Sequence, residues 1–293
     1  MRICAAAIQM CSEPSNVAAN LEHAESLLRQ AHDGGAELAV LPELFNTGYG
    51  FIRDYAPYGE TTDGPTLAFL RERCRRWRMD VAAGFVEREG RHLYDALAYV
   101  TAEGEVHVYR KRHLVFWERF RFRPGRAPVV VSTRWGRAGL AICADMIYQK
   151  VWADYRDRID MAVVAAAWPD FACRVTGRKH WLFGHVGPLS AAIPGKVAKD
   201  LGIPVVFANQ CGETRTVIPV VWQMISDRFA GRSSVSDGLH GPSVVAGAEE
   251  GVVLSSITVH SQRGLKSWRS MSPSVPAVSS FDSGPSTSDS PAA

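Results

Sequence analysis

Residues 137–148 read RAGLAICADMIY, in which a strand-like apolar run ends directly on Cys143. Two other strand-like runs end in the same way. Residues 37–43 (ELAVLPE) lead to Glu43, and residues 105–111 (EVHVYRK) lead to Lys111. In layered α/β folds, functional sites gather at the carboxyl ends of strands, because the backbone turns away there and leaves a crevice. The three runs therefore predict an α/β protein in which a thiol, a carboxylate and an ammonium are candidates for one site.

These three groups would form an activated nucleophile if they met. The Glu43 carboxylate would take the proton of the Cys143 thiol, and the resulting thiolate would attack. The Lys111 ammonium would favour the thiolate, which lowers the pKa of the thiol, and would later face a developing oxyanion. Sequence periodicity alone does not show that the three side chains converge.

The rest of the chain alternates strand-like and helix-like segments. Helices are expected at residues 16–32, 65–77, 151–157 and 189–201, and further strands at residues 3–10, 80–87, 93–101, 128–132, 161–166, 203–208 and 252–259. Several of these strands are separated only by turn residues, such as Ala102 to Gly104, which indicates hairpins. This pattern predicts one layered α/β domain with mixed sheets over residues 1–260. Residues 261–293 are rich in Ser and Pro with few apolar anchors, so we expect a disordered tail.

Composition excludes several classes of protein. The chain has 293 residues, of which 46% are hydrophobic and 22% charged, as is usual for a globular protein. The net charge of +3 is too small for a dedicated nucleic-acid binder, and no apolar run is long enough for a membrane helix. The N-terminus lacks the pattern of a secretory signal, so we expect a cytoplasmic protein. Six cysteines without a C-x-x-C pair favour neither disulfides nor structural zinc, and we expect no metal or cofactor.

Three segments resemble, in order, the signature blocks of the nitrilase superfamily of carbon–nitrogen hydrolases. They are LPELFNTGY (residues 41–49), YRKRHL (residues 109–114) and GLAICADMIY (residues 139–148). The resemblance covers roughly residues 3–259, and residues 229–241 (FAGRSSVSDGLHG) are similar to the closing hairpin of the family. It implies an α-β-β-α sandwich. It also implies cleavage of non-peptide C–N bonds through a thioester acyl-enzyme that water then resolves.

The resemblance assigns a role to each candidate catalytic residue. Glu43 would be the general base and Lys111 the oxyanion stabiliser, with Cys143 as nucleophile. The backbone N–H of Ala144 would be a second oxyanion donor. Glu118, in WERFRFRPG, would be the second glutamate that positions the substrate nitrogen or the water. Family members also associate through helices near the cysteine strand, which predicts a homodimer or larger assembly through residues 148–157 and 189–201.

The chain departs from the family pattern at several positions. Ala144 stands where amidases have an aromatic residue, which leaves more room beside the thiolate. Asp145 is more similar to the amidase and carbamoyl-hydrolase branches than to true nitrilases, which have Glu there. Asp95 stands where family hairpins commonly carry Asn. Residues 172–201 replace the short helix from which relatives line the substrate pocket.

The sequence does not identify the substrate. We expect a thiol hydrolase that releases ammonia from a small linear amide or N-carbamoyl compound, and Tyr49, Trp117, Trp168 and His180 are candidate substrate contacts. Two alternatives stay open: a nitrilase or N-acyltransferase on the same fold, and a non-enzymatic binding protein. Residues 111–126 are dense in Arg and aromatic residues. The small net charge favours a loop over the active site, offering arginine to an anionic substrate group, over a nucleic-acid patch.

Overall fold

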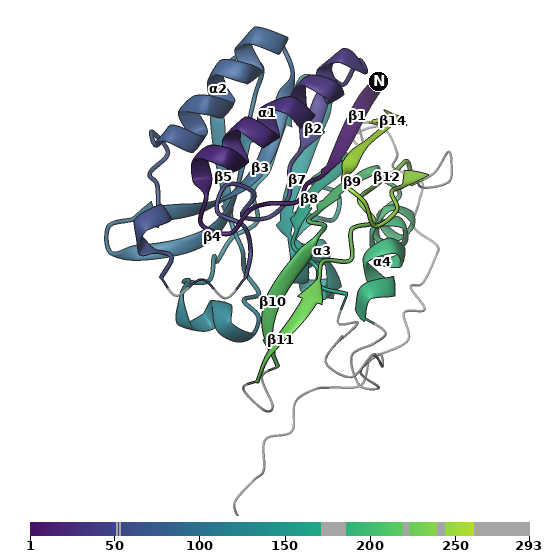
Figure 1. The fold of residues 1–293 in the computed structure, drawn as a ribbon. Helices are drawn as coiled ribbons and strands as arrows, with labels where there is room; N and C mark the ends of the chain where they lie inside the picture. The colour runs from purple at the N-terminus through teal and green to yellow at the C-terminus, as the bar shows by residue number, and fades with distance from the viewer. Residues whose placement is uncertain (51, 53, 171–185, 219–222, 239–243, 261–293) are drawn as a thin grey trace, which may run out of the picture.

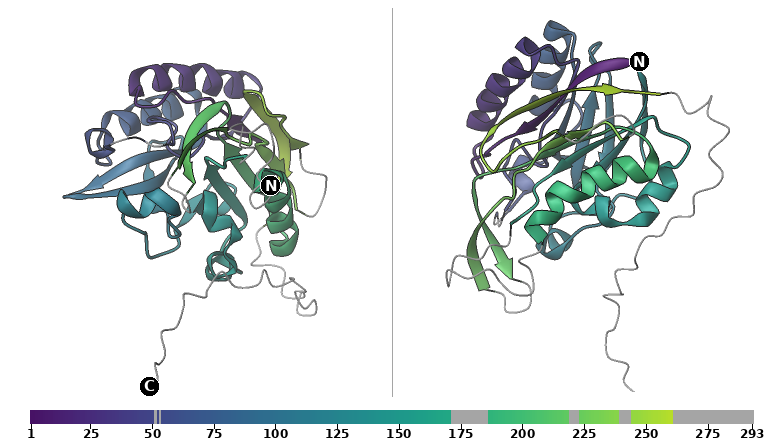
Figure 2. Two further views of the ribbon diagram at one scale, coloured as in Figure 1. Left: turned by 60° about the horizontal axis from the view of Figure 1, so that its bottom comes forward. Right: turned by 90° about the vertical axis from the view of Figure 1, so that its right-hand side faces the viewer.

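The structure is a computed structural model that describes residues 1–260, apart from residues 51, 53, 171–185, 219–222 and 239–243. Its elements form four layers (Figures 1 and 2). Helices α1 (Val17–Asp33) and α2 (Pro65–Trp77) cover one outer face. Helices α3 (Gln149–Tyr155) and α4 (Val186–Leu201) cover the other, and two six-stranded sheets lie between them. The predicted α-β-β-α sandwich is confirmed.

The two sheets have similar topologies. The first has the strand order β14-β1-β2-β3-β4-β5, with β1, β2 and β3 parallel to one another and the outer pairs antiparallel. Its strands are β1 (Arg2–Gln9), β2 (Leu38–Val40), β3 (Asp80–Glu89), β4 (His92–Val100), β5 (Val106–Arg110) and β14 (Gly251–Thr258). Parallel strands flanked by antiparallel ones confirm the prediction of mixed sheets.

The second sheet has the order β13-β12-β9-β8-β7-β6, with β7, β8 and β9 parallel at its centre. Its strands are β6 (Val130–Thr133), β7 (Gly136–Ile142), β8 (Met161–Ala166), β9 (Val205–Asn209), β12 (Ser234–Ser236) and β13 (Val244–Val245). β12, within the predicted closing hairpin of residues 229–241, pairs antiparallel with β13, which lies beyond that range. All six residues of β8 are buried, because this strand lies between β7 and β9 and both faces of the sheet are covered there.

Apolar periodicity explains where the layers pack. One core cluster joins the first sheet to the second and the second sheet to α3 and α4, and includes Val40 and Tyr109 from the first sheet, Leu140 from the second and Trp152 from α3. A second cluster joins α1 and α2 to the outer face of the first sheet. Helix α1 begins after Asn16, whose side chain accepts a hydrogen bond from the Ala19 N–H, as the sequence predicts.

Three features differ from the sequence prediction. Strands β10 (Glu213–Ile218) and β11 (Gln223–Arg228) form a separate antiparallel hairpin that was assigned no element. The short 3₁₀ helices η1 (Ala56–Tyr58), η2 (Phe116–Phe120) and η3 (Cys143–Ile147) were also missed, because single turns give no periodic signal. Helix α4 begins at Val186 and continues through Pro194. Val197 and Ala198, which follow the proline in the sequence, pack into the core.

Two predictions fall partly or wholly on residues that are not described. The tail at residues 261–293 lies outside the described residues, and so do residues 172–185 of the divergent segment. Within the described part of the chain, no helix combines the length and apolar character that a membrane crossing requires.

Gly84 lets β3 pass close to the segment that follows β2. Its N–H donates to the carbonyl oxygen of Pro42 (3.1 Å), and its carbonyl accepts from Phe45 N (3.0 Å). A Cβ atom at this position would lie 2.5 Å from Glu43 Cα and 2.6 Å from Leu44 N, both backbone atoms that cannot give way easily. A glycine here therefore fixes the position of Glu43 against the sheet.

We expect Gly84→Ala to destabilise the protein by about 1–3 kcal/mol, because the added methyl group overpacks a backbone contact. Urea unfolding followed by circular dichroism measures the loss. Gly251→Ala is the matched control, since it also lies in a strand of the first sheet and a Cβ there meets nothing within 4 Å. Equal stability of the two variants would contradict this packing.

Candidate active site

The three reactive side chains singled out in the sequence lie at the ends of strands on the facing sheets. Glu43 follows β2 by three residues, Lys111 directly follows β5, and Cys143 directly follows β7. Leu44 and Cys143 have positive φ angles of 48° and 45°, in the left-handed region that non-glycine residues rarely adopt. Backbone strain of this kind clusters at functional sites, where the surrounding fold enforces it.

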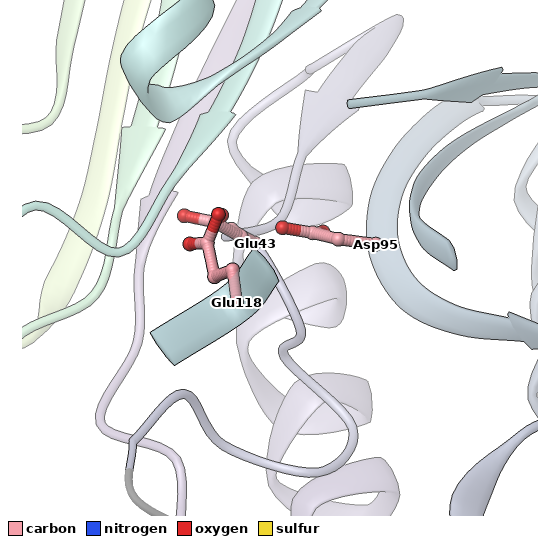
Figure 3. A group of neighbouring side chains, drawn as sticks. All are labelled: Glu43, Asp95 and Glu118. Atoms are coloured by element: carbon pink, nitrogen blue, oxygen red, sulfur yellow. The ribbon is translucent and has the colours of Figure 1, made fainter. Parts of the chain in front are cut away.

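The ammonium of Lys111 is surrounded by three carboxyl groups. Its Nζ atom lies 2.5 Å from Glu43 Oε1, 2.7 Å from Glu118 Oε1 and 3.3 Å from Asp95 Oδ2. All four side chains are fully buried. Figure 3 shows that the carboxyl groups of Glu43, Asp95 and Glu118 are directed toward one another. The structure thus brings Glu43, Lys111 and Glu118 together, and adds Asp95.

Charge balance in this cluster decides which groups are ionised. Burial alone would lower the pKa of Lys111, but Glu118, Glu43 and Asp95 outweigh it and raise the pKa well above its usual value. The lysine therefore stays charged. Burial, and next the neighbouring Glu43, raise the pKa of Asp95 well above its usual value. Three ionised carboxylates around one ammonium would leave two uncompensated buried charges, so Asp95 holds a proton.

The same three carboxyl groups have the geometry of a cation site. One oxygen from each lies within 4.8 Å of the others. Lys111 Nζ lies at hydrogen-bond distance from two of these groups and 3.3 Å from the third. The ammonium thus supplies the positive charge that a metal ion would bring, and these residues do not fit a metal.

The Cys143 thiol lies beside Glu43. The backbone N–H of Ala167 donates to Glu43 Oε2 (2.7 Å). Burial raises the pKa of the thiol well above its usual value, and Glu43 and Glu118 raise it further. Lys111 and the Ala167 N–H lower it by less. The thiol therefore keeps its proton, which differs from the expected lowering, because carboxyl groups already balance the charge of Lys111.

Asp145 connects the segment after Lys111 to the segment after Cys143. Its buried carboxylate accepts hydrogen bonds from the Tyr109 hydroxyl (2.7 Å), the His113 N–H (2.9 Å) and the Ile142 N–H (3.3 Å). A hydrogen bond of 2.8 Å joins it to His113 Nδ1 as well. In the sequence, Asp145 served only to distinguish the amidase and carbamoyl-hydrolase branches from true nitrilases. Its contacts show that it also links β5 to β7.

The aromatic candidates lie around Glu118. The Tyr49 hydroxyl donates to Glu118 Oε1 (2.5 Å), and the Tyr49 ring packs against Trp117, with 5.1 Å between centroids. Trp117 is buried and also stacks on Tyr55. Trp168 is buried just after β8, and its backbone N–H donates to Asn209 Oδ1 (2.7 Å). His180 lies outside the described residues. Ala144 is the second residue of η3, directly after Cys143.

The sequence contained a signal for Asp95 that was not used. The predicted hairpin turn at residues 102–104 fixes the pairing of β4 with β5, in which Ala96 lies opposite Arg110. One residue further along, the Lys111 N–H donates to the Asp95 carbonyl (2.9 Å). Asp95 was noted only as a departure from the usual Asn. The turn register places its side chain beside Lys111.

Comparison with known proteins gives one family. The family described as carbon-nitrogen hydrolase matches residues 4–252. A nitrilase of Pyrococcus abyssi is 36% identical over 138 residues, which are 44% of this chain and 51% of that protein. A chloroplastic omega-amidase of Arabidopsis thaliana is 30% identical over 179 residues, or 55% of this chain and 47% of that protein. The chain thus spans about half the length of these relatives.

A solved structure of similar fold is that of an amidase from Nesterenkonia sp., in a variant that shows Michael addition of acrylamide at its active-site cysteine. Its TM-score is 0.70 at 22% identity, and the match covers 88% of this chain and 93% of that one. At this identity the likeness concerns the fold.

The protonated state of Asp95 makes a prediction for stability. A carboxyl group whose pKa is raised by folding stabilises the protein fully below its unfolded pKa, and this contribution is lost as pH rises through the folded pKa. Asp95→Asn removes the titrating proton. Its free energy of unfolding, relative to wild type, should therefore increase as pH rises above the unfolded pKa of about 4, by up to about 1.4 kcal/mol per pH unit, until the folded pKa is passed.

Urea unfolding of both proteins across this pH range measures the difference. Asp33→Asn, at an exposed position on α1, controls for the effect of an amide in place of an acid. A difference between Asp95→Asn and wild type that does not change with pH would show that Asp95 is ionised throughout.

Proposed function

The chain belongs to the carbon-nitrogen hydrolase family, and from this premise we propose that it is a thiol hydrolase of small amides. Its substrate would be a linear amide or N-carbamoyl compound, cleaved at a non-peptide C–N bond through a Cys143 thioester with release of ammonia. The observation that carries the proposal is the buried ion pair of Lys111 with Glu43, shared with Glu118, beside a buried thiol.

In the first step, the Cys143 sulfur attacks the amide carbon while its proton passes to Glu43. The raised pKa of the thiol supports this order, because the proton leaves only as the carbon–sulfur bond forms. Negative charge develops on the amide oxygen. We assign its stabilisation to the Lys111 ammonium and the backbone N–H of Ala144, which act as an oxyanion hole.

In the second step, the tetrahedral intermediate collapses and the C–N bond breaks. The leaving nitrogen takes the proton from Glu43, which becomes an anionic base again. A water molecule then attacks the thioester carbon and gives a proton to Glu43. The carbon–sulfur bond breaks, the acid leaves, and the sulfur regains its proton. The net reaction is amide and water to carboxylic acid and ammonia.

We assign Glu118 to the positioning of the substrate nitrogen or the water. Its carboxylate is buried, accepts from the Tyr49 hydroxyl at 2.5 Å and contacts Lys111 Nζ at 2.7 Å. These contacts hold it in one orientation beside the nucleophile. Tyr49, Trp117 and Trp168 are proposed to contact the rest of the substrate, and the proposal extends to His180.

Amides rather than nitriles are favoured by one residue that follows the nucleophile. Asp145 stands where true nitrilases have a glutamate. The name omega-amidase of the Arabidopsis thaliana relative is in keeping with this choice. The name nitrilase of the Pyrococcus abyssi relative keeps nitrile hydrolysis as the second candidate.

The proposed nucleophile can be tested by intact mass. Wild-type protein mixed with a panel of small amides and N-carbamoyl compounds should gain the mass of one acyl group and release ammonia. Cys143→Ala should lower turnover by at least about a thousandfold and show no adduct, because no other group can form the thioester. Cys74→Ala removes another fully buried thiol, on α2, and should retain turnover.

Three results would redirect the proposal. Acid and ammonia formed from nitriles but not from amides would indicate a nitrilase. An amine that outcompetes water for the acyl group would indicate an N-acyltransferase. Neither turnover nor adduct with any of these compounds would favour a binding protein that keeps the fold.

We also propose that the chain forms a homodimer through η3, α3 and α4. Ile147, Tyr148 and Leu189 are large apolar side chains with 53%, 38% and 42% of their surface exposed, and η3 and α4 contact each other. Together they form an apolar surface where the family resemblance predicts association.

Ile147→Lys combined with Leu189→Lys should therefore convert a dimer into a folded monomer, as measured by light scattering at micromolar concentration. Phe120→Lys is the control, because Phe120 is 72% exposed but lies on η2, outside this surface. A monomeric wild-type protein under these conditions would contradict the dimer.

A further inference from the structure

A second concave site lies on the other side of the segment that carries Lys111 and Glu118. It is a groove of about 750 Å³ between the β3–β4 turn, residues 112–124 and Tyr148. Five arginines line it: Arg91, Arg112, Arg119, Arg121 and Arg123. Two histidines add to this lining, and no acidic residue within the described part of the chain does. We name it the arginine groove.

The arginine groove is distinct from the candidate active site. Neither Cys143 nor any member of the carboxylate cluster lines it. Neighbouring residues of one segment serve the two sites: Lys111 and Glu118 reach the cluster, while Arg112 and Arg119 face the groove. The sequence predicts a loop over the active site that offers arginine to an anionic substrate group; the groove that these arginines line includes neither Cys143 nor the carboxylate cluster.

Arg112 carries the strongest sign of a missing ligand. Only 9% of its side chain is exposed, and Nη2 donates to Asp154 Oδ2 at 2.6 Å. The other terminal nitrogen, Nη1, is buried and has no hydrogen-bond partner among the described residues. A buried donor on a charged group is costly to leave unpaired, so an acceptor entering the groove would stabilise it.

The remaining arginines of the groove leave its positive charge uncompensated. Within the described residues, none of Arg91, Arg119, Arg121 and Arg123 forms an ion pair. Arginines elsewhere do: Arg110 pairs with Glu87 and Glu89, and Arg137 pairs with Asp160. The groove therefore gathers four arginines that form no ion pair among the described residues.

We propose that the arginine groove binds a compact small anion with at least two negative charges, such as a phosphate ester or a polycarboxylate. Guanidinium groups bind phosphate and carboxylate oxygens through pairs of parallel hydrogen bonds, and several around one cavity suit a multiply charged ligand. The volume lies in the range of small-molecule sites. One wall is rigid, because His113 stacks on Tyr148 with 3.7 Å between ring centroids.

Bound anion would act on the same segment that carries Glu118. His113 lines the groove and is held by Asp145, which lies two residues after Cys143. Arg119 lines it and directly follows Glu118, and its Nε donates to the Leu114 carbonyl (3.0 Å). An anion that joins Arg112 to Arg119 and Arg121 would cross-link this segment and raise the thermal stability of the protein.

Titration calorimetry of the full-length protein tests this proposal with pyrophosphate and with citrate as probes. We expect saturable binding of at least one probe at constant ionic strength, together with a rise in Tm. A preference for pyrophosphate would identify a phosphate-bearing ligand, and a preference for citrate a polycarboxylate. The measurement needs no turnover, so it is independent of the proposed amide hydrolysis.

Arg121→Ala combined with Arg123→Ala should weaken binding of the preferred probe at least about tenfold. The matched control is Arg75→Ala combined with Arg76→Ala, which removes two exposed arginines from α2 and should leave affinity unchanged. The proposal is overturned if sodium chloride of equal ionic strength reproduces the Tm rise. It is equally overturned if the control variant weakens binding as much as the groove variant.

Discussion

The structure depends on the burial of one ammonium among three carboxyl groups. Lys111 and its three acidic neighbours are removed from water entirely, and none of them could stay there alone at acceptable cost. Breaking a buried ion pair leaves an unpaired charge and typically costs about 3–5 kcal/mol. Since Glu43 lies 68 residues before Lys111 and Glu118 follows Lys111 on the same segment, this mutual requirement also fixes how the two segments meet.

The segments that carry these residues meet at the ends of strands from the two facing sheets. β2 is a parallel strand of one sheet and β7 a parallel strand of the facing sheet, and positive φ angles at Leu44 and Cys143 turn the chain just beyond their carboxyl ends. Two polar links then hold the sheets in register at these strand ends. Asp145 joins β5 to β7, and the backbone N–H of Ala167, directly after β8, donates to Glu43.

Local sequence predicted most of this framework, because buried strands and capped helices carry strong periodic signals. The ranges ending at Glu43, Lys111 and Cys143 and the mixed sheets were all confirmed. The β10–β11 hairpin was missed, and so were the single-turn helices. The expected lowering of the thiol pKa was wrong for a different reason: burial raises this pKa most, and Glu43 and Glu118 raise it further. Such long-range electrostatics cannot be judged from one strand at a time.

The proton count of the cluster bears on how the proposed reaction proceeds. With Asp95 protonated, the resting site holds two carboxylates, one ammonium and a neutral thiol. Transfer of the thiol proton to Glu43 moves the negative charge to the substrate oxygen without changing the net buried charge, which avoids a large desolvation penalty. Neutral Glu43 then competes less for Lys111 Nζ, 2.5 Å away. The ammonium is thereby freed toward the oxyanion at the moment when that charge develops.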